Sequence, residues 1–444
     1  MKEKSKKLTL QQKLAKRKYG KPSRIFLFIY RVVISGFVAP RYKPHYVIKD
    51  NINKCDGPCF VIWNHLSRLD HAFVMEATYP RRINILAGYN EFFRSHLAFV
   101  FRLMNIIPKK NYAEDMASVR AMNSIIKKGG CIAFSPEGMS SIYGQNQPIV
   151  PGTGRFLQFY HIPVYFVKLA GSYLTSTKVC LDERQGRVDV ELSLLFTPEQ
   201  LQSMTPEEID DRINEAFRHD DYAWNKQQHI KWKKTNGRIC EKLHDICYQC
   251  PRCGAELTMV GEKNYIKCEH CGNGAKMNDY YEFEPFDADC VIPESPTKWV
   301  ELERQNTIRE IRENPNYSFT EKVKVGSLPT DHLIKNQKTS EPCGEGNLTI
   351  DHQGMHFEGT KDGQPWQWDL PYNMLYSLPI VTDTSFFSLY VDKEYYDFFP
   401  ERPAVGKMLV LTEEMHRLHE NIWKNFKWYD YMYEGMEMPV ANKE

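Results

Sequence analysis

Val61-Ile62-Trp63-Asn64-His65-Leu66-Ser67-Arg68-Leu69-Asp70-His71 is the stretch that decides the fold. The apolar run from Phe60 to Trp63 predicts a buried strand, and a helical pattern begins at Leu69. His65 and Asp70 therefore lie where a strand end turns into a helix. Because ligands of α/β folds bind in the crevice outside such strand ends, we expect both side chains to face that crevice.

His65 and Asp70 are a candidate pair for proton transfer. Residues five apart on an ideal helix point about 140° away from each other, so the two side chains meet only if the first turn is irregular. If they meet, the carboxylate accepts the imidazole Nδ1–H and leaves Nε2 as a base for a hydroxyl proton. The chain has 14 histidines, and such a spacing is expected almost once by chance, so the pair needs support from the rest of the sequence.

Three further blocks supply that support, in order along the chain. Asn105–Lys110 comes first, and Phe134-Ser135-Pro136-Glu137-Gly138-Met139-Ser140-Ser141 then continues an apolar strand over Cys131–Phe134. Gly152–Arg155 leads into His161-Ile162-Pro163-Val164. With the His-x4-Asp block, this order resembles the four signature blocks of the glycerolipid acyltransferases. The resemblance covers roughly residues 45–200 and is strongest for the bacterial 1-acylglycerol-3-phosphate (lysophosphatidate) acyltransferases, in the variety that carries a zinc ribbon.

The resemblance implies transfer of a fatty acyl chain from a thioester of CoA or acyl carrier protein to the free hydroxyl of lysophosphatidate, giving phosphatidate. His65 would be the general base and Asp70 its orienter. A thioester needs no enzyme nucleophile, so the enzyme deprotonates the hydroxyl, aligns the substrates and stabilises the oxyanion. The residues expected to bind substrate are Asn64, Lys109, Lys110, Glu137, Gly138 and Arg155.

The third block departs from the family pattern. Many members have Thr or Asn and then Arg after Glu-Gly, where this chain has Met139 and Ser140. The cation that binds phosphate must then come from elsewhere, and Lys109, Lys110 and Arg155 are the candidates, unless they are ordinary solvated surface cations. The departure leaves a different lysophospholipid acceptor open.

The N-terminal region predicts contact with a membrane. Residues 1–24 hold ten Lys and Arg against one Glu, a net charge of +9, so the rest of the chain, which totals +2, carries −7. The fifteen residues Ile25–Ala39 are mainly apolar, are interrupted by the charged Arg31, and fall short of the ~20 needed to span a bilayer. A helix lying in the interface of anionic phospholipids fits this composition. We therefore expect a peripheral or monotopic protein on the cytoplasmic face of the cell membrane; a helix packed on the domain is the alternative, and a cleaved signal peptide fits less well.

Four of the twelve cysteines have metal-ligand spacing. Cys250 and Cys253 form one Cys-x2-Cys pair, Cys268 and Cys271 form the second, and fourteen residues lie between the two pairs. Two such pairs around a predicted hairpin indicate a closed, structural Zn²⁺ site. Iron, or a cluster that recruits Cys247, is the alternative. The local charge is mixed rather than basic, so we expect no nucleic-acid partner.

The whole chain is predicted to be an α/β protein with a mainly parallel sheet, followed by the ribbon and a β-rich C-terminal domain. The last block also resembles a pleckstrin-homology-like or GRAM-like module, with a β-rich packing domain as the alternative. The expected boundaries are 1–44 (basic arm and interfacial helix), 45–200 (acyltransferase domain), 201–246 (helical extension), 247–284 (ribbon), 285–342 (linker and helix) and 343–444 (β-rich domain with a C-terminal helix).

Two other classes of function compete with the acyltransferase. A lipid-binding regulatory protein with a decayed site would account for Met139 and Ser140. A zinc-ribbon nucleic-acid protein would bind DNA or RNA with a steep dependence on salt.

Overall fold

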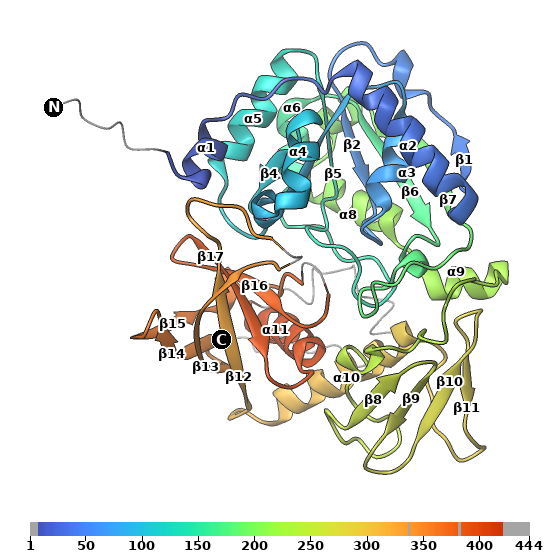
Figure 1. The fold of residues 1–444 in the computed structure, drawn as a ribbon, viewed down its shortest axis with the longest axis vertical. Coiled ribbons are helices and arrows are strands. Elements are labelled where there is room, and N and C mark those ends of the chain that lie inside the picture. The colour runs from blue at the N-terminus through green and yellow to red at the C-terminus, as the bar shows by residue number, and fades with distance from the viewer. Residues whose placement is uncertain (1–7, 336–337, 381–382, 421–444) are drawn as a thin grey trace.

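The computed structural model describes residues 8–335, 338–380 and 383–420. Figure 1 shows three parts: an α/β domain at the top, a small sheet at the lower right and a larger sheet at the lower left. The first residues of the basic arm and the last residues of the region expected to hold the C-terminal helix, 421–444, lie outside the described residues.

The α/β domain is built on a seven-stranded sheet in the order β1-β7-β6-β2-β5-β3-β4. Neighbouring strands are parallel except for β6 and β7, which are antiparallel. The prediction of a mainly parallel sheet is therefore confirmed. The strands are β1 (His45–Ile48), β2 (Phe60–Trp63), β3 (Ile83–Gly88), β4 (Ile107–Lys109), β5 (Cys131–Phe134), β6 (Val164–Ala170) and β7 (Asp189–Phe196).

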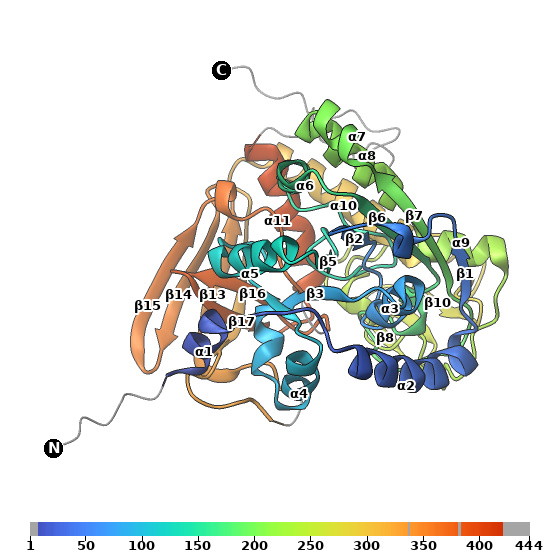
Figure 2. The same ribbon diagram turned by 90° about the horizontal axis from the view of Figure 1, so that it is seen from above.

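Successive side chains of the central strands point to opposite faces of the sheet, so the domain has one hydrophobic core on each face. Phe60 and Ile62 of β2 pack with one group of helices, while Val61 and Trp63 face the other side. Figure 2 shows α2, α3 and α4 below the sheet and α6, α7 and α8 above it. The helices are α1 (Leu10–Lys16), α2 (Arg24–Tyr42), α3 (Asp70–Thr78), α4 (Ser95–Leu103), α5 (Met116–Lys127), α6 (Thr153–Tyr160), α7 (Pro198–Ser203), α8 (Pro206–Phe217) and α9 (Asp221–Gln228).

Helix α2 has one face on the protein and one face outside it. Leu27, Val38 and Tyr42 are buried, and Arg31 forms an ion pair with Glu76 of α3 at 2.8 Å. The opposite stripe is exposed and consists of Ile25, Phe28, Ile29, Val32 and Val33. Among the described residues, α2 is the one helix long and apolar enough to cross a membrane, by length and composition alone. Its 19 residues exceed the fifteen apolar residues marked by the sequence, because the helix continues through Pro40 to Tyr42.

Residues 247–285 hold the small sheet at the lower right and the two cysteine pairs, and this region is called the cysteine sheet below. The expected hairpin is β8 (Met259–Glu262) and β9 (Tyr265–Cys268), which are antiparallel. Two further strands, β10 (Gly274–Met277) and β11 (Phe283–Pro285), extend it in the order β11-β10-β9-β8.

The C-terminal region is a six-stranded antiparallel sheet with two helices. Its order is β15-β14-β13-β12-β17-β16. The elements are α10 (Pro296–Glu313), β12 (Ser318–Ser327), β13 (Glu341–Asp351), β14 (Met355–Lys361), β15 (Gln364–Leu370), β16 (Phe387–Val391), β17 (Glu394–Pro400) and α11 (Val405–His419).

The sheet begins earlier than the boundary expected at residue 343. Strand β12 lies in the span expected to be a linker, because a charged residue, Glu321, occupies one of its inward positions and hides the alternation. Glu321 is 2% exposed there and accepts a hydrogen bond from Arg402 Nε at 2.8 Å. Helix α11 starts at Val405.

Candidate active site

His65 and Asp70 are in direct contact. His65 Nδ1 lies 2.7 Å from Asp70 Oδ2, with the imidazole 29% exposed and the carboxylate buried. Asp70 begins α3, and the same Oδ2 accepts hydrogen bonds from the backbone N–H groups of Leu66 at 2.7 Å and Ser67 at 3.0 Å. These bonds fold the chain back in front of the helix, which is the irregular first turn that the contact requires.

The second oxygen of Asp70 is held by two serines. Ser172 Oγ donates to Asp70 Oδ1 at 2.5 Å, and Ser67 Oγ donates to it at 3.2 Å. Asp221 in turn accepts from the backbone N–H groups of Gly171 and Tyr173 at 2.6 and 2.7 Å, and so fixes the turn that presents Ser172. The sequence analysis assigned no role to Ser172 or Asp221.

Glu137 joins the third block to the first. Its carboxylate accepts from the backbone N–H of His65, from the N–H of Gln147 at 2.6 Å and from Ser135 Oγ at 3.2 Å. Burial raises the pKa of Glu137 well above its ordinary value, although these hydrogen bonds oppose the shift. The structure thus brings Glu137 to the backbone of His65, and its contact with substrate stays a prediction.

Asn64 and Gly138 stabilise the local backbone: Asn64 through hydrogen bonds, and Gly138 through the turn that it allows. The buried Asn64 amide donates to the carbonyl oxygen of Leu169 at 2.9 Å and accepts from its N–H at 2.8 Å, which joins the end of β2 to β6. Gly138 has φ +78°, and a Cβ there would lie 3.0 Å from the phenolic oxygen of Tyr112. Glycine is therefore required for this turn, and substrate contacts of both residues stay predictions.

The three cations predicted to bind phosphate lie in different surroundings. Lys109 Nζ donates to the carbonyl oxygen of Lys110 at 2.7 Å. Lys110 Nζ lies 5.2 Å from the ring centroid of Tyr89 and 5.5 Å from that of Tyr390. Arg155 is exposed on α6.

A fourth cation, missed by the sequence analysis, reaches the third block. Lys178, on the connection between β6 and β7, donates from Nζ to Ser140 Oγ at 2.8 Å. The next residue, Ser141, donates its N–H to the carbonyl oxygen of His65 at 2.7 Å, so Lys178 lies close to the first block. Burial lowers the pKa of Lys178 to about 8.

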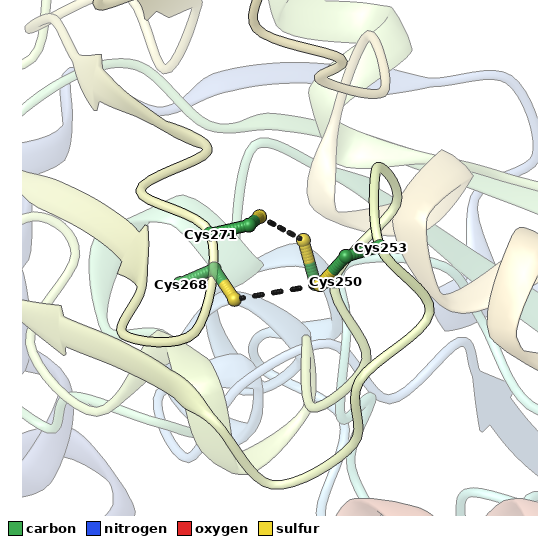
Figure 3. Close-up of side chains that lie close together, drawn as sticks. All are labelled: Cys250, Cys253, Cys268 and Cys271. Atoms are coloured by element: carbon green, nitrogen blue, oxygen red, sulfur yellow. Dashed lines mark hydrogen bonds between the residues drawn. The ribbon is translucent and has the colours of Figure 1, made fainter.

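The four predicted metal ligands form one group. The sulfur atoms of Cys250, Cys253, Cys268 and Cys271 all lie within 4.8 Å of one another (Figure 3). Cys250 Sγ is 3.6 Å from Cys271 Sγ, and Cys253 Sγ is 3.8 Å from Cys268 Sγ. Four thiolates ~2.3 Å from a tetrahedral Zn²⁺ are about 3.8 Å apart, so the donor set fits zinc. Cys247 is buried outside this group.

The cysteine sheet is also bound to the catalytic domain. Tyr281 donates from its hydroxyl to the carbonyl oxygen of Leu174 at 2.9 Å and accepts from Arg184 Nη1 at 2.8 Å. On its other side, Gln249 donates its N–H to Glu303 of α10 at 2.8 Å. The sheet therefore connects the turn next to Ser172 with the C-terminal helices.

Comparisons with known proteins agree with the geometry at the level of the domain. Residues 43–167 match the family model described as Acyltransferase. Among solved structures, the 1-acyl-sn-glycerophosphate (LPA) acyltransferase PlsC from Thermotoga maritima is 17% identical, covers 46% of this chain and 81% of its own, and has a TM-score of 0.38. The Ran-binding domain of the nuclear pore complex component NUP2 from Ashbya gossypii is 16% identical, covers 22% and 94%, and has a TM-score of 0.17. No curated protein matches.

The matched range contains the His65–Asp70 pair, so the family match supports an acyltransferase domain in residues 43–167. The two solved structures are too distant to carry a conclusion about substrate.

Proposed function

We propose that the protein transfers a fatty acyl chain from a CoA or acyl-carrier-protein thioester to the free hydroxyl of lysophosphatidate, giving phosphatidate. The observation that carries this proposal is the His65–Asp70 contact at 2.7 Å within the matched domain. Asp70 accepts the Nδ1–H of His65, and Nε2 takes the hydroxyl proton as the hydroxyl oxygen attacks the thioester carbonyl carbon. Collapse of the tetrahedral intermediate breaks the C–S bond, and the imidazolium returns the proton to the departing thiolate.

Lys178 is our candidate for the cation that binds the acceptor phosphate. The third block has Ser140 where many family members place Arg one residue after a Thr or Asn, and Lys178 Nζ contacts that serine at 2.8 Å. A protonated ammonium beside a hydroxyl offers a charge-assisted donor and a neutral donor to one phosphate. Lys178 would thus replace the missing arginine from a different loop.

Membrane contact is proposed for the exposed face of α2. Phe28, Val32 and Val33 are each more than half exposed on this face. Exposed apolar groups beside a basic arm favour anionic phospholipid surfaces. The acceptor and the acyl product are both lipids, so an enzyme held at the cytoplasmic face of the membrane would meet its substrate there.

A structural role is proposed for zinc in the four-cysteine group. Cys250, Cys253, Cys268 and Cys271 would hold one Zn²⁺ with four thiolates and no open position. The metal would keep the small sheet folded and Tyr281 in contact with the catalytic domain.

An acceptor panel tests the proposal. Purified, zinc-loaded protein is given a long-chain acyl-CoA or acyl carrier protein with lysophosphatidate, lysophosphatidylethanolamine or lysophosphatidylglycerol, and the products are separated by mass. We expect phosphatidate to form faster than the acylated products of the other two acceptors. If only another lysophospholipid is acylated, the proposed acyl transfer is supported and that lipid replaces lysophosphatidate as the acceptor. Absence of transfer to every acceptor would favour a lipid-binding regulatory protein.

A further inference from the structure

Three cysteines lie near the N-terminal ends of β2 and β5, at the opposite end of these strands from His65 and Glu137. Cys131 begins β5, Cys59 directly precedes β2, and Cys55 lies in the turn before it. The sulfur atoms of Cys59 and Cys131 are 3.2 Å apart, and Cys55 precedes Cys59 by four positions in the chain. Cys59 therefore has one thiol next to it in space and a second thiol close to it in sequence. The paths of β2 and β5 can be followed in Figure 2.

The strand register places Cys59 opposite Cys131. The parallel ladder pairs Phe60 with Ile132, and the N–H of Ile132 donates to the carbonyl oxygen of Cys59 at 3.1 Å. Neighbouring strands lie ~4.8 Å apart, which is within the ~4.4–6.8 Å range of Cα separations found across disulfides. A disulfide between these residues therefore needs only a small local shift.

Arg81 supplies a positive charge to the same cluster. Its Nε lies 3.1 Å from Cys131 Sγ, its Nη1 donates to the carbonyl oxygen of Cys55 at 2.9 Å, and its Nη2 donates to that of Gly57. A guanidinium beside sulfur favours the thiolate. The hydrogen bond from Cys59 and the charge of Arg81 lower the pKa of Cys55 to about 7, although burial opposes them. Cys55 is partly exposed, whereas Cys59 and Cys131 are buried.

We propose that Cys55, Cys59 and Cys131 form a thiol relay that a hydroperoxide oxidises to a reversible disulfide between β2 and β5. The Cys55 thiolate attacks hydrogen peroxide, and uptake of one proton gives the sulfenic acid and water. The Cys59 thiol condenses with the sulfenic acid, releasing a second water and forming the Cys55–Cys59 disulfide. The Cys131 thiolate then attacks Cys59 Sγ and releases the Cys55 thiolate. In total, two thiols lose two electrons and two protons, which reduce the peroxide to two waters.

The final disulfide joins residues 72 positions apart. It ties together the starts of the two strands whose ends carry His65 and Glu137. A cross-link of this length restricts the unfolded chain, so the oxidised protein should melt at a higher temperature than the reduced one.

Peroxide treatment of the full, zinc-loaded chain tests the relay. The protein is exposed to hydrogen peroxide, remaining thiols are alkylated, and peptides are mapped by mass spectrometry while bound zinc is measured. We expect a Cys59–Cys131 cross-linked peptide about 2 Da lighter than the two free peptides, one retained zinc, and full reversal by dithiothreitol. Cys55→Ser should slow its formation at least tenfold, and Cys131→Ala should trap the Cys55–Cys59 disulfide. Cys180→Ser, a buried cysteine outside the cluster, is the matched control and should change nothing.

Three results would overturn the relay. One is formation of the cross-link at an unchanged rate in Cys55→Ser. The second is oxidation confined to the four ribbon cysteines with loss of zinc. The third is a second bound zinc that disappears in Cys55→Ser, which would make the three thiols a metal site.

Discussion

Lys178 carries a buried ammonium group next to the third block. Burying a charge costs free energy unless hydrogen bonds or an opposite charge compensate it. The side chain is 5% exposed, and burial lowers its pKa to about 8. Below that pH the ammonium is mostly charged and above it mostly neutral. A phosphate bound there would therefore lose its cation as the pH rises through about 8.

The first prediction concerns this pH dependence. The KM for lysophosphatidate should rise between about pH 7.5 and pH 9, because Lys178 loses its proton while the phosphate is already fully ionised. Lys178→Met should raise the KM roughly ten- to hundredfold at pH 7, the value of a lost hydrogen bond to a charged group. Initial rates over a range of lysophosphatidate concentrations measure both effects.

Lys178→Arg is the control for this experiment. Because a guanidinium stays protonated throughout the range, its KM should remain nearly flat with pH. An unchanged KM in Lys178→Met would show that Lys178 does not bind the acceptor phosphate.

Single residues also mark the limit of sequence reasoning at the site. His65 and Asp70 were predicted to be partners because they are close in sequence and stand in a recognisable block. Ser172 lies 102 positions from Asp70, and a serine after a strand has no distinguishing pattern. Lys178 was missed for the same reason, since only the folded β6–β7 connection brings it to Ser140.

At the level of elements, α2 combines a packed face with an exposed one. Its packed face is fixed by Leu27, Val38 and the Arg31–Glu76 ion pair, so α2 is part of the domain's packing. The exposed stripe repeats at positions three and four apart, as expected for one face of a helix. Substitutions on this stripe can therefore change membrane affinity without disturbing the fold.

The second prediction is that Phe28→Ser with Val32→Ser weakens vesicle binding. Burying each side chain in lipid is worth ~1.5–3 kcal/mol when complete, so partial burial of both predicts a roughly ten- to hundredfold loss of partitioning. Sedimentation with vesicles containing anionic phospholipid measures it. Phe159→Ser is the matched control, because Phe159 is 74% exposed on α6, across the sheet from α2 in Figure 2. Equal binding by the α2 variant and the wild type would move the membrane contact elsewhere.

The elements themselves were predictable where one local rule dominated. Strands β2 and β5 match the expected bounds residue for residue, because each is a short apolar run buried on both faces. Thr205 and Glu208 have the spacing of a capping box, and that capping box opens α8. Strand β12 was missed because its inward Glu321 is neutralised by Arg402, a partner 81 positions away.

For the whole molecule, the cysteine sheet is the connection between the catalytic domain and the C-terminal region. Tyr281 contacts the turn after β6 on one side, and Gln249 contacts α10 on the other. Lys407 of α11 also pairs with Glu256 of the cysteine sheet. Loss of the proposed zinc ion should therefore affect regions beyond the sheet itself.

The third prediction follows from this arrangement. Cys253→Ser should reduce bound zinc from about one per chain to well below one and lower the melting temperature, because a three-thiolate site binds the metal less well. The rate of acyl transfer should fall severalfold as the turn carrying Ser172 loses its support. Metal analysis, thermal unfolding and initial rates are measured on the same preparation. Cys290→Ser, outside the four-thiol group, should match the wild type in all three. A zinc-depleted variant with unchanged stability and rate would contradict a structural role.

The most direct test of the central claim is the initial rate of acyl transfer by His65→Ala. Removing a general base should lower kcat by roughly 10²–10⁴-fold, with zinc content and melting temperature unchanged. His161→Asn is the control: His161 is exposed at the end of α6 with φ +47°, a conformation that Asn tolerates, and its rate should equal that of the wild type. Phosphatidate formation that falls in His65→Ala alone is the result predicted here. A folded His65→Ala enzyme that retains the wild-type rate would contradict the assignment of the His65–Asp70 pair.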